Sequence, residues 1–150
     1  MSATRVLPQG VEHYVDPKTG ELLAMIVRGS FRGGRYNFFT PDDFPLQLGQ
    51  NFYPPGETIE AHTHVPQERH VNRVNEFIYL VAGRLLLHLF ALDRGPVKDV
   101  ELVSGDCVLL TAGGHGFEVL EESRLLEVKQ GPYLGVEDKV KLAPGRSARS

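Results

Sequence analysis

The chain has 150 residues, of which 41% are hydrophobic and 23% charged, as in a soluble globular protein that buries its own core. Its formal net charge is −3 and its basic residues are scattered, which argues against a nucleic-acid-binding surface. One cysteine, Cys107, excludes an intrachain disulfide and lies in an apolar run as a small hydrophobe. Neither an apolar signal core nor a membrane-length apolar run is present. We expect a single cytoplasmic domain over 1–150, without membrane or nucleic-acid partners.

Turn residues recur along the chain and separate short apolar runs. Residues 1–20 carry two Pro and two Gly and are expected to form an N-terminal arm, and residues 131–150 a C-terminal tail. The runs between them predict strands at 21–27, 35–40, 46–53, 77–81, 84–92, 97–103, 107–110, 117–120 and 125–129. No segment has the pattern of an amphipathic helix. The sequence therefore predicts an all-β protein with a barrel core at about 21–130, since closure removes exposed strand edges.

The strongest chemical signal is the stretch from Gly56 to Gly83. His62 and His64 lie two residues apart in what we expect to be an extended run, so both side chains point to one side. Glu76 opens the next apolar run, where a carboxylate can meet them from a neighbouring strand. Two imidazoles and a carboxylate form a facial set that suits a first-row divalent metal with open coordination positions.

The same residues resemble the first motif of the cupin family. That motif has a glycine, five residues, His-x-His, a spacer, a glutamate, six residues and a second glycine. Gly56, His62, His64, Glu76 and Gly83 match it in both outer spacings. A second cupin motif is similar to the stretch from Gly105 to Val119. There the spacing to the histidine is one residue short, and Thr111 and Val119 replace the usual Pro and Asn.

The resemblance implies a double-stranded β-helix, the jelly-roll barrel of the cupins. It also implies one divalent ion (Fe, Mn, Ni or Zn), held by His62, His64, Glu76 and, as fourth ligand, His115. Cupins commonly pair, and apolar strands such as 84–92 offer surface for a homodimer.

One alternative ligand arises from the inserted loop 65–75. The interval between His64 and Glu76 is eleven residues, where the common cupin motif has three or four. Glu68 satisfies the usual spacing after His64, whereas Glu76 satisfies the spacing before Gly83 and precedes an apolar strand. A strand holds ligand geometry better than a loop, so we favour Glu76.

Other polar residues are candidates for the interior. Glu127 and Lys129 share one face of their strand, which is either a solvated outer face or the cavity wall, where the pair could serve acid–base steps. Tyr53, Tyr79 and His88 are candidate pocket residues, and ordinary core positions are the alternative for all three.

Three functions fit this pattern. The first is a metal-dependent enzyme, an oxygenase or isomerase acting on a small oxygen-rich metabolite. The second is a non-catalytic barrel that binds or senses a sugar or other metabolite. The third is a metal-free sugar-nucleotide isomerase or epimerase with a histidine base, which the four intact metal ligands argue against. Fold alone does not choose among them.

Overall fold

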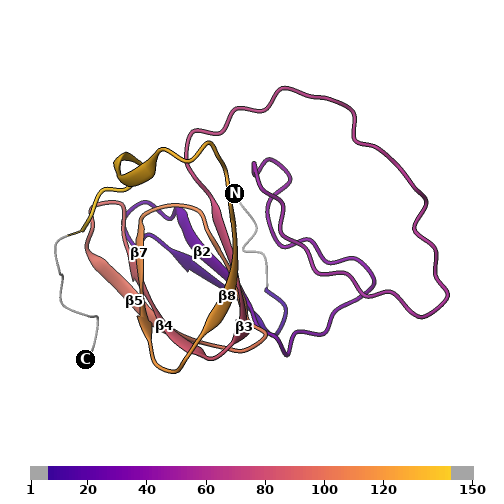
Figure 1. Cartoon of the computed structure of the whole chain (residues 1–150), viewed down its shortest axis with the longest axis horizontal. Helices are drawn as coiled ribbons and strands as arrows, with labels where there is room; N and C mark the ends of the chain where they lie inside the picture. Colours follow the sequence, from indigo (N-terminus) through magenta and orange to yellow (C-terminus); the bar gives the residue numbers. More distant parts are fainter. Residues whose placement is uncertain (1–6, 143–150) are drawn as a thin grey trace. The chain divides into compact units, whose positions relative to one another are not determined.

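The computed structural model describes residues 7–142 of the chain, and it confirms an all-β protein (Figure 1). Contacts divide the chain into two compact units. Unit 1 comprises Met1–Phe31 and Arg73–Ser150, and unit 2 comprises Arg32–Asn72. The ends of the expected arm and tail, 1–6 and 143–150, lie outside the described residues. The single domain expected from the sequence stays a prediction.

Unit 1 contains two antiparallel sheets. Its strands are β1 (Val11–Val15), β2 (Leu22–Val27), β3 (Glu76–Ala82), β4 (Arg84–Phe90), β5 (Pro96–Val103), β6 (Cys107–Leu110), β7 (Gly114–Val119) and β8 (Arg124–Lys129). One sheet has the order β1-β2-β6-β3-β8 and the other the order β5-β4-β7. Among the described residues the two sheets do not join into a closed barrel, so the jelly-roll topology stays a prediction.

The core lies between the two sheets because alternate residues of their strands turn the same way. Leu85, Leu87 and Leu89 of β4 are buried there against Ile78 and Leu80 of β3. These three leucines therefore fill the core of their own unit and offer no surface to a second copy. The sequence argument for a homodimer from this strand is wrong on that point, and the homodimer itself stays a prediction.

Gly83 links β3 to β4, and the hairpin that the glycine suggests between two apolar runs is wrong, because the two strands lie in different sheets and do not pair. Gly83 has a φ of 96°, which is the left-handed region that glycine adopts most readily. A Cβ atom on it would lie 2.3 Å from Ser123 Oγ and 2.4 Å from the Glu122 carbonyl oxygen. Glycine is thus required both for the backbone angle and for the close approach of the loop before β8.

Asp106 ties the turn before β6 to the end of β2. Its carboxylate is buried and accepts hydrogen bonds from the Gly29 amide at 2.9 Å and the Val103 amide at 3.1 Å. Arg28 donates to the same carboxylate at 2.8 Å and also to Glu12 at 2.6 Å. This buried, fully paired carboxylate explains why the Gly105-Asp106 turn needs an acidic residue.

Unit 2 differs from the sequence prediction. Segments 35–40 and 46–53 do not form strands, and a single bridge between Phe38 and Gly49 is the only β pairing of these segments. Backbone hydrogen bonds still join the two segments, from the Phe39 amide to the Leu48 carbonyl oxygen at 2.9 Å and from the Gln50 amide to the Asn37 carbonyl oxygen at 2.9 Å. The Asn37 side chain adds to them, since its amide donates to the carbonyl oxygens of Gly34 at 2.6 Å and Gln50 at 2.7 Å.

Both ends of the chain hold more structure than predicted. The expected arm contains β1, which pairs with β2, and the expected tail contains a single-turn 3₁₀ helix, η1 (Gly135–Asp138). No helix in the described residues is long and apolar enough to cross a membrane.

Candidate metal centre and its cavity

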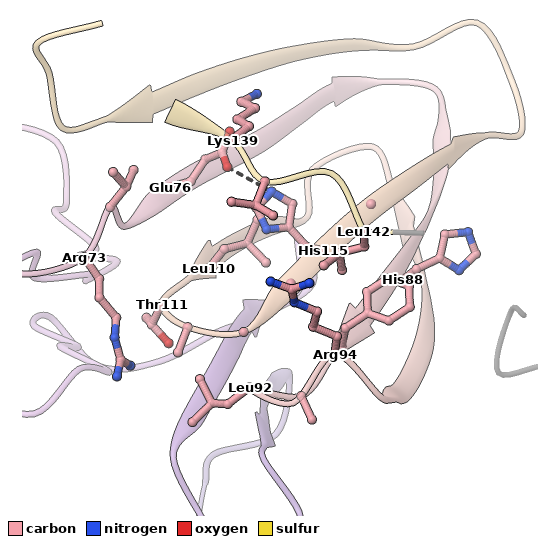
Figure 2. A pocket seen from close by; sticks show the side chains of 18 of the residues that line it. Arg73, Glu76, His88, Leu92, Arg94, Leu110, Thr111, His115, Lys139 and Leu142 are labelled. Carbon is pink, nitrogen blue, oxygen red and sulfur yellow. Dashed lines mark ion pairs between the residues drawn. The ribbon is translucent and has the colours of Figure 1, made fainter. Parts of the chain in front are cut away.

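Unit 1 has a cavity of about 910 Å³ between the ends of its two sheets (Figure 2). Side chains from β3, β4, β6, β7 and β8 form part of its wall. Residues 73–74, the turn after β4, residues 111–113, and the last residue of η1 with residues 139–142 complete it. The strands that carry Glu76 and His115, β3 and β7, are therefore both part of the cavity wall.

Glu76 and His115 meet inside this cavity. Glu76 begins β3 and faces the same side as the core residues Ile78 and Leu80, because side chains alternate along a strand. His115 lies on β7 opposite Leu89, a core residue, and so also faces inward. His115 Nε2 lies 3.0 Å from Glu76 Oε2, and the side chains are 32% and 13% exposed (Figure 2). Two of the four predicted ligands are thus brought together.

Glu127 and Lys129 share the inner face with Glu76. Strand β8 pairs with β3 so that Lys129 stands opposite Glu76 and Glu127 opposite Ile78. Directly opposed residues of an antiparallel pair point to the same face. Lys129 Nζ lies 3.0 Å from Glu127 Oε1, and Lys129 contributes to the cavity wall. Leu126 and Val128 consequently face outward, with 57% and 49% of their surface exposed.

The two pairs act on one another electrostatically. The pKa of Glu76 falls to about 2, chiefly because His115 donates a hydrogen bond to the carboxylate, while burial opposes the change. The nearby charge of Lys129 adds to the lowering. The hydrogen bond to Glu127 raises the pKa of Lys129. The inner face therefore holds the ionised carboxylate of Glu76 and the charged ammonium of Lys129, and the imidazole of His115 contacts Glu76 from β7.

A titration tests this arrangement. In the metal-free protein, His115→Leu is expected to raise the pKa of Glu76 from about 2 toward its ordinary 4.5, because leucine has no donor and the strongest stabiliser of the carboxylate is removed. Because the pKa of Glu76 is lower in the folded than in the unfolded chain, the ionised carboxylate adds to the free energy of unfolding. This contribution is complete above pH 4.5 and is lost as the pH falls toward 2. Carboxyl ¹³C NMR measures the shift. His88→Gln is the control, and a Glu76 pKa unchanged in the His115 variant would contradict the assignment.

His62 and His64 belong to unit 2. Residues 57–75 form neither helix nor strand, so the expected strand at the His-x-His pair is not present. The two rings are nevertheless neighbours, with centroids 5.4 Å apart, and both residues are exposed. His62 Nδ1 donates to the Glu60 carbonyl oxygen at 2.8 Å. That bond leaves Nε2 with its lone pair, the arrangement seen in metal-ligating histidines.

The donor set fits a divalent metal by its chemistry. Imidazole nitrogens and a carboxylate suit Fe, Mn, Ni and Zn. Within residues 7–142, no three or more His, Cys, Asp or Glu side chains gather closely enough to hold an ion. The structure thus brings Glu76 together with His115 within unit 1, and His62 together with His64 within unit 2.

The remaining candidates have different surroundings. His88 lines the cavity, but side chains alternate along β4. His88 lies between the core residues Leu87 and Leu89, so its side chain is on the opposite face of the strand from theirs. Its Nδ1 is 2.7 Å from Asp99 Oδ1. Tyr79 alternates away from the core residues beside it and is 38% exposed.

Two further candidates lie in unit 2. The ring of Tyr53 contacts Tyr36 edge to face, and the guanidinium of Arg35 lies over both rings. Glu68, the alternative ligand, is exposed beside His70 at 3.3 Å. Neither residue lies on the wall of the cavity in unit 1.

Sequence reasoning missed four cationic residues of the cavity wall, Arg73, Arg94, Lys139 and Lys141. Arg94 lies in the turn after β4, where a basic residue is ordinarily solvated, and the two lysines follow η1 in the expected tail. Arg94 has a φ of 73°, but no sequence pattern marks an arginine for that conformation.

In comparisons with protein-family models, curated protein sequences and solved structures, nothing matches this chain.

Proposed function

We propose that this chain is a divalent-metal-binding protein of the cupin type that acts as an enzyme on a small oxygen-rich metabolite, by an oxygenase or isomerase reaction. The observation that supports it most is the meeting of Glu76 and His115 in the cavity, because the two residues belong to different sequence motifs. His62 and His64 would supply the remaining nitrogen ligands. When bound, the ion would polarise an oxygen of the substrate as a Lewis acid.

The chain's own residues would supply the rest of the chemistry. Glu76 stays ionised across the physiological range and so is ready to ligate without losing a proton. Lys129 and Glu127, at 3.0 Å on the same face, form a proton-handling pair in which the charged lysine would act as the general acid. The buried leucines and Ile78 behind them keep water from one side of the cavity. A binding module needs no such proton-handling pair, so this pair favours an enzyme.

The choice of carboxylate ligand has a direct test. Glu76→Gln is expected to weaken metal binding by about 10- to 100-fold, the size of loss that even an outer partner of a metal ligand causes. Glu68→Gln, its matched control, is expected to change the affinity little, because Glu68 is an exposed loop residue. Competition titrations with a chelator measure both. If Glu68→Gln shows the larger loss, the loop carries the ligand.

A second substitution separates an enzyme from a binding module. Lys129→Met keeps most of the side-chain stem and removes the charge beside Glu127. We expect the variant to keep its metal and to lose turnover by about 100-fold or more, as expected for a general acid or base. ¹H NMR of a panel of hydroxy and keto acids in D₂O, with wild type and variant, follows consumption and exchange. Equal turnover would leave Lys129 without a catalytic role, and binding without turnover by the wild type would identify a binding module.

A further inference from the structure

The cavity wall carries a charge opposite to that of the whole chain. The formal net charge of the chain is −3. The wall, in contrast, contains five cationic side chains and only two carboxylates. The cations are Arg73, Arg94, Lys129, Lys139 and Lys141, and the carboxylates are Glu76 and Asp138. A cavity lined by one sign of charge concentrates ligands of the other sign.

Two of these cations already have partners. Arg73 forms an ion pair with Glu21, and Lys129 pairs with Glu127. Glu76, one of the two wall carboxylates, is paired with His115. Among the described residues, Arg94, Lys139 and Lys141 have no ion-pair partner, although all three help form the wall. Three exposed cations of the cavity wall therefore form no ion pair within residues 7–142.

The backbone at Arg94 is in a conformation that an arginine rarely adopts. Its φ of 73° is unusual for a residue other than glycine, asparagine or aspartate. The turn is held by the Arg94 amide, which donates to the Ala91 carbonyl oxygen at 2.9 Å, and by the Ala91 amide, which donates to Gly95 at 2.8 Å. Figure 2 shows the Arg94 side chain pointing into the cavity toward His115 and Leu142. Strained residues of this kind concentrate at functional sites.

We propose that Arg94, with Lys139 and Lys141, binds an oxyanion group, a carboxylate or a phosphate, of the small-molecule ligand. A guanidinium presents two parallel N–H donors that match either oxyanion, and the two ammonium groups add charge without fixing its orientation. This inference rests on the proposed function in taking the cavity as the ligand site. It adds that the ligand is an anion and that it is held on the side of the cavity formed by the β4–β5 turn and the segment after η1.

The test is an NMR titration of the chelator-treated, metal-free protein at constant ionic strength. Inorganic phosphate and succinate are added separately, and ¹H–¹⁵N shifts of Gly113, Gly114 and His115 report on the cavity wall. We expect saturable shifts with at least one anion. Phosphate alone would identify a phosphate ligand and succinate alone a carboxylate ligand. Absence of saturable shifts with both would overturn the proposal.

Variants assign the binding to these side chains. Arg94→Gln is expected to weaken the anion about tenfold or more, since hydrogen bonds to charged groups are the strong ones. Lys139→Gln and Lys141→Gln should each weaken it less, and Arg124→Gln, an exposed arginine on β8, should leave it within about twofold. Arg94→Gly removes the charge and the backbone strain together, so it should weaken binding as much without lowering the melting temperature. Anion affinity unchanged in both Arg94 variants would also overturn the proposal.

The titration is independent of the metal. Saturable anion binding by a protein that purifies without metal would leave the anion site standing and remove the metal from the proposed function. Stoichiometric metal in a protein that binds neither anion would leave the metal site standing and overturn the anion site.

Discussion

Replacing His62 and His64 together by alanine is expected to remove nearly all of the divalent metal that the purified protein carries. Two of four ligands are lost, and each histidine supplies a neutral imidazole nitrogen that no neighbouring residue replaces. The affinity should fall by more than about 100-fold, which exceeds the usual cost of losing one outer partner of a ligand. Elemental analysis after purification without chelator measures the change.

The control for this experiment is His70→Ala. His70 lies in the same exposed segment of unit 2, pairs with Glu68 and has no place in the proposed ligand set. We expect it to keep the wild-type metal content. Stoichiometric metal in the His62 and His64 double variant would rule out the His-x-His pair as ligands. An equal loss in the His70 variant would indicate that the whole loop, not the pair, determines metal content.

Asp106→Ala is expected to destabilise the fold by about 3 kcal/mol, the cost of breaking a buried, hydrogen-bonded ion pair. The substitution leaves the Gly29 and Val103 amides without their acceptor and removes one of the two carboxylates that Arg28 contacts. For a chain of this length, the loss corresponds to a melting temperature lower by roughly 6–12 °C. Thermal unfolding monitored by circular dichroism measures it.

Glu101→Ala serves as the control. Glu101 pairs with Arg84 at 2.8 Å, but both side chains are more than 40% exposed, so removing the pair should cost no more than about 1 kcal/mol. An Asp106 variant as stable as the Glu101 variant would show that the carboxylate is not a structural anchor. The turn would then need another explanation for its acidic residue.

The strands around the core could be predicted because their side chains alternate. Because Glu127 and Lys129 lie two residues apart, the sequence predicts that they share one face of β8. Only the pairing of β8 with β3 shows that this face is turned toward the cavity. Glu76 was favoured over Glu68 because it begins an apolar strand, and its meeting with His115 agrees with that choice without testing the metal. The local sequence pattern thus shows which residues share a face of a strand, and the pairing of the strands decides which face is turned toward the interior.

Other features depend on contacts that no local pattern encodes. The aromatic run 35–40 has strand propensity and forms backbone hydrogen bonds with residues 48–50, yet the pairing amounts to a single β bridge between Phe38 and Gly49. The lysines after η1 look like a solvated tail until Leu142 is placed against Gly114, where a Cβ atom would lie 2.5 Å from Leu142 Cδ1. Tertiary contact, not composition, brings Lys139 and Lys141 to the cavity.

The metal content of the wild-type protein tests the central proposal most directly. The protein should be purified without chelator or affinity metal, and its Fe, Mn, Ni and Zn content measured by inductively coupled plasma mass spectrometry against protein concentration. The proposed function predicts close to one divalent ion per chain, surviving dialysis against buffer and removed by a strong chelator. Less than about a tenth of an ion per chain, unchanged after incubation with each of the four metals and dialysis, would contradict it.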